Sequence, residues 1–192
     1  MKKLKLYFKR IYRLSLSLKK QEDILWAELK KCFSIGRWKY GVYENEKYIE
    51  SVWDMSNEQT ALAGCMNKPV SFFNMIYEGQ FHSRVKILSE FPVEMTTDLF
   101  ILATHFNNLL SNGFVSIDAN NNCVECHQKQ DLLIPLLYSD EIYKQISNHY
   151  LISKDIYSAF EKLIEHKEPP AIIIADFLKE LKEKEKQNKE VE

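Results

Sequence analysis

The stretch FPVEMTTDLFILATHFNNLLSNG, residues 91–113, decides the fold because it is the best-marked helix in the chain and strand-like segments flank it. Thr97 is predicted as the N-cap with Asp98 in the first turn, and Gly113 is predicted to stop the helix in a left-handed conformation. Its apolar stripe recurs at helical spacing and is widened by two neighbours: Leu99, Leu102, Ala103, Phe106, Leu109 and Leu110, with Phe100 and Ile101. The pattern predicts a buried helix.

Strand-like segments lie on both sides of this helix. Upstream, residues 70–77 and 81–90 are joined by a short glycine-containing turn, and the second segment alternates between apolar and charged side chains. Downstream, residues 114–118 alternate, and an asparagine-rich turn leads into residues 123–127. A helix with a hairpin on either side predicts the α+β class, a two-layer fold with an antiparallel sheet of two hairpins packed against the central helix and C-terminal helices.

The charges are distributed unevenly along the 192 residues, although the net charge is −1. Residues 1–20 contain eight lysines and arginines and no acidic residue, so the rest of the chain, with 18 basic and 27 acidic residues, has a net charge of about −9. An acidic body argues against a general nucleic-acid binder. We predict a basic arm at 1–20, a single α+β domain at 21–181 and a charged, fraying tail at 182–192.

No part of the sequence has the pattern of a membrane span or an export signal. No run approaches the roughly 20 apolar residues that a span needs. Lys9, Arg10 and Arg13 interrupt each candidate for the apolar core of about 7 to 15 residues that a secretory signal needs. We therefore expect a cytoplasmic protein whose four cysteines are reduced thiols.

The basic arm has the pattern of an amphipathic helix. Its apolar residues share one helical face with bases around them: Leu4, Phe8, Ile11, Leu14 and Leu18. Such a helix packs its apolar face on the acidic body or on a second copy of the chain, or it lies on an anionic membrane surface. The sequence leaves these alternatives open.

The other segments are predicted more coarsely. Residues 21–33 are expected to form a helix that ends at Gly36, and the aromatic, poorly periodic residues 38–53 are expected to pack at the edge of the core. A capping box of Ser56 with Gln59 predicts a short helix through Cys65. The remaining expectations are an edge strand or loop at 131–137 because of Pro135, and helices that begin near Ser139, Ser153 and Pro170.

One short motif suggests cofactor chemistry. Cys123-Val-Glu-Cys126-His127 matches the C-x-x-C-H pattern of haem attachment, and its ligands could also serve zinc or thiol redox chemistry. In a regular strand, however, the two thiols point to opposite faces, and the sequence lacks an export signal and a second ligand pair. Most weight therefore falls on ordinary strand residues, and His105, within the central helix, is expected to be a satisfied core or edge group.

The order of elements from about residue 70 to residue 178 resembles a known family. A hairpin, a capped helix with Ala103 and Asn107-Asn108 before its end, a second strand pair and C-terminal helices together look like the YbjN-like group of small bacterial proteins, which share the fold of type III secretion chaperones. The resemblance implies an often dimeric, non-enzymatic domain that presents an apolar groove or sheet face to a partner polypeptide. The basic arm, the aromatic segment before Ser56 and the long helical end depart from that pattern.

We therefore expect a non-catalytic, chaperone-like or adaptor module in the cytoplasm that binds a protein partner, forms a homodimer and does not bind nucleic acid. No catalytic, cofactor-binding or metal-binding residue is assigned. One alternative is a small metal- or thiol-dependent enzyme that uses Cys123, Cys126 and His127. The other is docking on an anionic membrane surface through residues 1–20.

Overall fold

The computed structural model describes residues 2–36, 38–55, 68–138 and 140–190. Within these ranges the chain divides into two compact units, which are described separately below. Unit 1 comprises Met1–Val85 and His127–Leu151, and unit 2 comprises Lys86–Cys126 and Ile152–Glu192. The short helix predicted from the Ser56 capping box and the cap predicted at Ser139 lie outside the described residues. The single domain predicted for residues 21–181 stays a prediction.

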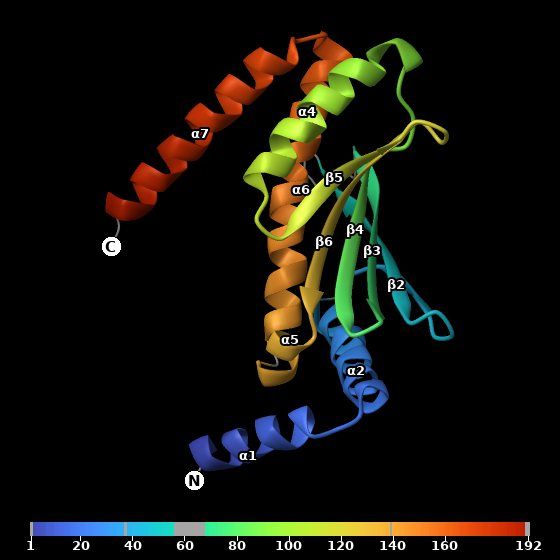
Figure 1. Cartoon of the computed structure of the whole chain (residues 1–192), viewed down its shortest axis with the longest axis vertical. Helices are drawn as coiled ribbons and strands as arrows, with labels where there is room; N and C mark the ends of the chain where they lie inside the picture. The colour runs from blue at the N-terminus through green and yellow to red at the C-terminus, as the bar shows by residue number, and fades with distance from the viewer. Residues whose placement is uncertain (1, 37, 56–67, 139, 191–192) are drawn as a thin grey trace. The chain divides into compact units, whose positions relative to one another are not determined.

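Six strands form one antiparallel sheet in the order β1-β2-β3-β4-β6-β5 (Figure 1). The strands are β1 Tyr40–Tyr43, β2 Tyr48–Asp54, β3 Pro69–Tyr77, β4 Gln80–Leu88, β5 Gly113–Asp118 and β6 Cys123–Asp131. Both predicted hairpins are present, as β3 with β4 and β5 with β6, and the predicted α+β class is confirmed. The aromatic segment around residues 40–54, expected only as edge packing, forms a third hairpin of β1 and β2.

The turns explain where these hairpins form. Glu78 and Gly79 connect β3 to β4 with φ angles of 48° and 74°, and left-handed residues in a two-residue loop match the twist of paired strands. Lys47 and Asn122 precede β2 and β6 with φ angles of 49° and 48°. Each turn therefore ends in, or contains, a left-handed residue that redirects the chain into the returning strand.

Helices cover one face of the unit 1 sheet. Helix α2, Leu18–Gly36, ends at the predicted glycine and buries Leu25, Leu29 and Phe33 completely. From the first half of α6, Glu141–His166, the ring of His149 packs on Phe72 of β3. The strands alternate between this covered inner face and an outer face, because β3 and β4 bury every second residue.

The basic arm folds as helix α1, Lys2–Leu14, which is shorter than the predicted residues 1–20 because Ser15-Leu16-Ser17 breaks the chain before α2. The side chain of Gln21 donates to the carbonyls of Arg13, Leu14 and Leu16 at 3.1–3.3 Å. Carbonyl groups at the end of α1, which have no partner within the helix, thereby gain a hydrogen bond. Helix α1 lies beside α5, Leu133–Leu137, in unit 1 (Figure 1). The corner between α1 and α2 is therefore held by hydrogen bonds.

The predicted central helix is α4, Thr96–Leu109, in unit 2, and both of its predicted ends are wrong. A 3-10 turn, η1 Val93–Met95, leads into the helix, and Met95 occupies the N-cap position that was assigned to Thr97. At the other end Leu110 is extended, and Gly113 opens strand β5, so no left-handed glycine is needed there. Helix α4 therefore continues directly from the 3-10 turn, and no capping side chain forms a hydrogen bond at its start.

Helix α4 is buried on one side only. Leu99, Leu102, Ala103 and Phe106 are buried, but Phe100, Ile101 and Leu109 are exposed, so the predicted widening of the apolar stripe is wrong. The ring of Phe106 packs near those of Phe160 and Phe177, at centroid distances of 6.2 and 5.0 Å. The Asn107 side chain also donates to the carbonyl of Val115 and accepts from its N–H, at 3.0 and 2.6 Å, which ties α4 to β5.

The C-terminal half differs from its prediction in two places, at Ser153 and at Pro135. Helix α6 is continuous, because Ser153, predicted as a cap, is a fully buried residue within it. Helix α7, Pro170–Glu190, begins at the predicted proline and extends into the charged segment 182–192, whose fraying stays a prediction. Pro135 lies in the first turn of α5, where a missing N–H costs no hydrogen bond, so the expected edge strand or loop is a short helix. None of the described helices has the length and apolar character to cross a bilayer.

Candidate binding site on the outer face of the sheet

Strand register in unit 1 aligns a set of side chains on the outer face of the sheet. Tyr48 lies opposite Met75, and Met75 lies opposite His82 on the next strand. Two register positions further along, Phe73 lies opposite Arg84. Directly opposed residues share a face, so these five side chains from β2, β3 and β4 form one continuous surface.

A pocket of about 350 Å³ lies on this face. It is lined by Tyr48, Phe73, Met75, His82, Arg84 and His127, and all six belong to unit 1. Ligand pockets in proteins usually have volumes of about 300 to 1,000 Å³ and combine apolar walls with a few polar groups. We call this site the histidine pocket.

Two histidines form the polar part of the pocket. Nε2 of His82 and Nδ1 of His127 are 3.3 Å apart, within hydrogen-bonding distance, and the rings are nearly parallel with their centroids 5.5 Å apart. One ring donates its N–H to the lone pair of the other, an arrangement that requires at least one of the two to be neutral. The pair therefore favours the neutral state of both rings over a doubly charged one.

Burial and nearby cations hold the histidines in that neutral state. Burial lowers the pKa of His127 to about 4, and the charges of His82, Arg84 and Lys129 act in the same direction. Burial, with Lys129 and Arg84, also lowers the pKa of His82. At neutral pH the pocket thus presents uncharged imidazoles beside positively charged groups.

Aromatic and cationic groups form the walls. The guanidinium of Arg84 lies over the ring of Phe73, 4.5 Å from its centroid, in a cation–π arrangement. Tyr48 stacks on Tyr43 with a centroid distance of 4.2 Å, and the Tyr43 hydroxyl donates to Glu50 at 3.3 Å. An apolar group could fill the space between the rings while an acidic group meets Arg84.

The lowered pKa of His127 does not suit a general base that works at neutral pH. A general base works best with a pKa near the operating pH, whereas the pKa of His127 is about 4. None of the six described residues that line the pocket is a carboxylate, a thiol or a serine hydroxyl. The described part of the chain also brings no three His, Cys, Asp or Glu side chains into a metal-binding arrangement, and the charges of Arg84 and Lys129 would oppose a bound cation.

The three residues of the C-x-x-C-H motif lie in different environments. His127 lies in the histidine pocket, but Cys123 and Cys126 are buried members of unit 2. Burial raises the pKa of the Cys126 thiol to about 11, and a hydrogen bond with Ser153 lowers it by less. A nucleophilic or metal-binding cysteine needs a thiolate, so the environment of Cys126 gives the thiol-dependent alternative little support.

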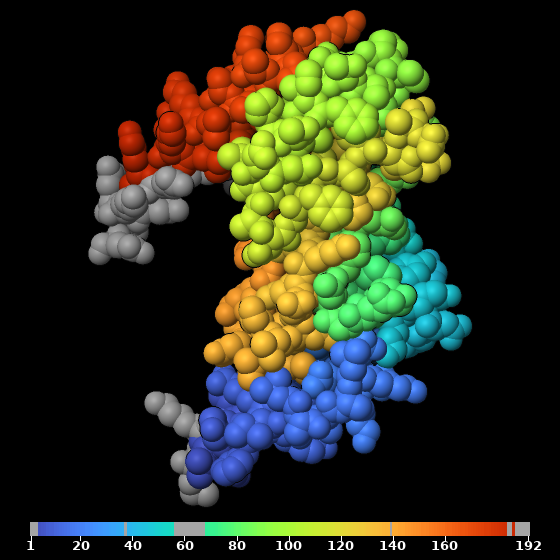
Figure 2. Space-filling view, viewed as in Figure 1, coloured from blue at the N-terminus to red at the C-terminus, as the bar shows by residue number. Residues whose placement is uncertain are grey.

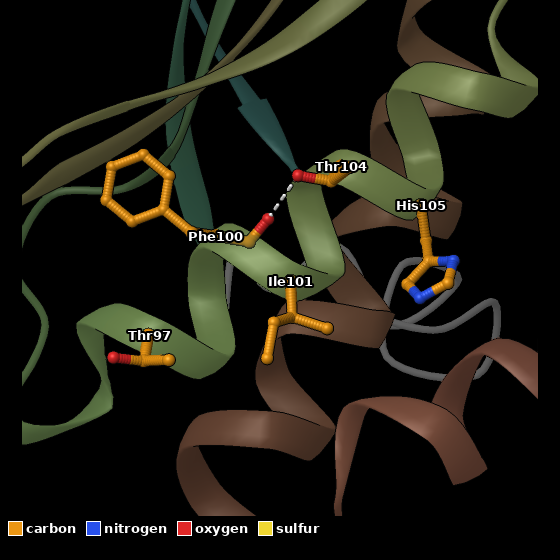
Figure 3. A pocket seen from close by; sticks show the side chains of 5 residues that line it. All are labelled: Thr97, Phe100, Ile101, Thr104 and His105. Carbon is orange, nitrogen blue, oxygen red and sulfur yellow. Dashed lines mark hydrogen bonds between the residues drawn. The ribbon is translucent and has the colours of Figure 1, made fainter.

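A second hollow lies along helix α4 in unit 2, with a volume of about 430 Å³. It is lined by Thr97, Phe100, Ile101, Thr104 and His105, which all come from one helix (Figure 3). The Thr104 hydroxyl donates to the carbonyl of Phe100 at 2.7 Å, within the helix itself. His105 was predicted as a core or edge group; it is exposed, so the core position is wrong. One helix supplies no converging polar groups, so we do not treat this hollow as a binding site.

Sequence reasoning found only part of the histidine pocket. His127 was singled out for a different chemistry, and Arg84 lies in the segment 81–90 that was predicted to alternate between apolar and charged side chains. His82 and Tyr48 were missed as site residues because their closeness to His127 depends on which strands pair and in which register. The alternation along β4 could have indicated part of the site, because it places His82 and Arg84 on one face of the strand.

Comparison of the chain with known proteins gave no matching family model and no matching curated protein.

Proposed function

We propose that this protein is a non-catalytic binding module and that the outer sheet face around the histidine pocket holds a segment of a partner polypeptide. The observation that carries this proposal is the combination of Phe73, Met75 and Tyr48 with Arg84 around one 350 Å³ pocket. Tyrosine, phenylalanine, methionine and arginine are the residue types enriched in protein interfaces. The proposal agrees with the function implied by the resemblance to the YbjN-like group.

The chemistry of the pocket indicates what the partner segment contains. The rings of Tyr48 and Phe73 offer apolar walls for an aromatic or branched aliphatic side chain. Arg84 and Lys129 place positive charge beside the neutral histidine pair, which favours an acidic group next to that anchor. We therefore expect a motif that joins one large apolar residue to an Asp, a Glu or a terminal carboxylate.

A selection from a random peptide library displayed on phage, with the purified full chain as bait, tests the proposal. Enriched peptides should share the apolar and acidic pair, and their synthetic versions should bind measurably in titration calorimetry. Phe73→Ala and Arg84→Gln should each weaken this binding by about tenfold or more, as anchor residues of interfaces do. Lys179→Gln, on the exposed surface of α7, removes the same charge as the arginine variant and should leave binding unchanged.

Peptides that bind Phe73→Ala and Arg84→Gln as tightly as the original protein would contradict the proposal. The thermal midpoint of each variant, measured by circular dichroism, shows whether a loss of binding reflects loss of the fold. The homodimer implied by the resemblance remains a separate expectation, and sedimentation equilibrium of the purified protein measures it.

A further inference from the structure

Within unit 1, the arginines of helix α1 hold it against α5 and α2. Arg10 Nε donates to the carbonyl of Leu137 at 2.8 Å, and its guanidinium lies over the ring of Tyr138. Arg13 is almost fully buried, donates to the carbonyl of Leu136 at 3.3 Å and forms an ion pair with Glu28 of α2. The inward side of α1 is therefore its arginine side.

This attachment turns the apolar side of α1 outward. With about 100° between successive residues of a helix, Leu4, Phe8 and Ile11 lie opposite Arg10 and Arg13. Their exposed fractions are 60%, 61% and 46%, which is unusual for large apolar side chains on one helical face. Figure 2 shows the dark-blue atoms of α1 at the surface, next to the orange atoms of α5. We call Leu4, Phe8 and Ile11 the outward face.

The charges around the outward face identify what fits it. Lys5 is exposed at its border, and Lys9 is exposed one turn further along, between Lys5 and the arginine side of the helix. Lys19 and Lys20 are exposed at the start of α2. Residues 1–20 contain no acidic side chain, so two copies that met through this face around a two-fold axis would bring their lysines together. An anionic surface would satisfy the lysines and cover the apolar residues at the same time.

We propose that α1 is an interfacial helix that docks this protein on anionic phospholipid membranes. Leu4, Phe8 and Ile11 would enter the boundary between headgroups and acyl chains, with Tyr7 and Tyr12 at its edges. Lys5 and Lys9 would meet the negatively charged headgroups, each with an attraction of about 1 kcal/mol. Because the arginines fix α1 on unit 1, the outward face is already presented before the protein meets a membrane.

Flotation of the purified full chain with lipid vesicles tests this proposal. Vesicles of phosphatidylcholine with about 30% phosphatidylserine should retain the protein about tenfold better than vesicles of phosphatidylcholine alone, and added salt should weaken the retention. The double variant Leu4→Ala with Phe8→Ala should reduce retention by about tenfold or more, because it removes most of the buried apolar area. Lys5→Glu with Lys9→Glu should remove the preference for phosphatidylserine.

Matched controls make the result specific. Lys179→Glu with Lys182→Glu changes the overall charge equally, on exposed positions of α7, and should alter retention by less than about threefold. Equal retention on neutral and anionic vesicles would overturn the proposal. So would a Leu4→Ala, Phe8→Ala variant that keeps its retention, or one whose mass in lipid-free sedimentation falls by half, since that result assigns the outward face to a second copy. Phe73→Ala should bind vesicles normally, which separates this proposal from the peptide-binding function.

Discussion

Replacing His127 with glutamine should make the protein less sensitive to acid. The folded-state pKa of His127 is about 4, whereas an unperturbed histidine has a pKa near 6.5, so the unfolded chain takes up a proton first as the pH falls. This contribution to stability is complete above about pH 6.5 and is lost progressively down to about pH 4. Between pH 7.5 and pH 5 the loss from this one ring is about 2 kcal/mol, and solvent around the half-buried ring reduces it to about 1 to 1.5 kcal/mol.

Urea denaturation at pH 7.5 and pH 5, followed by circular dichroism, measures this effect. Protonation of carboxylates contributes to both proteins, so the informative quantity is the difference between the original chain and His127→Gln. The variant should lose about 1 to 1.5 kcal/mol less of its free energy of unfolding over this pH range. His166→Gln, at the exposed end of α6, is the control and should follow the original protein. Equal losses for His127→Gln and the original chain would refute the lowered pKa of His127, which burial causes first and the charges of His82, Arg84 and Lys129 reinforce.

Two further predictions concern other buried groups. Asn74 is fully buried, and neither polar atom of its side chain has a hydrogen-bond partner among the described residues, so Asn74→Leu should raise the free energy of unfolding by about 1 to 2 kcal/mol; a lower thermal midpoint would show that the amide is satisfied. The buried thiol of Cys126 has a pKa of about 11, so it should react with iodoacetamide at pH 8 at least about a hundredfold more slowly in the folded protein than in urea. Mass spectrometry of the peptides measures the rate, and a fast reaction in the folded protein would contradict the raised pKa.

The sequence predicted those strands and turns whose conformation depends on residues close together in the chain. The β3 and β4 hairpin was predictable because Gly79 adopts the left-handed conformation at its turn and because every second residue of both strands is buried. The β1 and β2 hairpin was missed because all four residues of β1 are exposed, so this edge strand carries no alternation. A strand with no buried face leaves no periodicity in the sequence.

The errors at helix ends have a common cause. Ser153 has the residue type of an N-cap, yet it is buried inside α6, and Thr97 is a helical residue one position after the start of α4. Serine and threonine are favoured as N-caps, but they also occur within packed helices, and tertiary contacts decide between these two positions. The histidine pocket was beyond local patterns for the same reason, since His82 meets His127 only through the pairing of β4 with β6.

The three tryptophans of the chain, Trp26, Trp38 and Trp53, all belong to unit 1, and the rings of Trp38 and Trp53 lie 4.7 Å apart. Intrinsic tryptophan fluorescence is therefore an optical probe of unit 1 alone, whereas the aromatic packing around Phe106 in unit 2 emits no tryptophan light. Far-ultraviolet circular dichroism reports on the helices of both units. Coincident melting curves from the two signals would mean that the units unfold as one cooperative system, and separate curves would assign each transition to its unit without any added label.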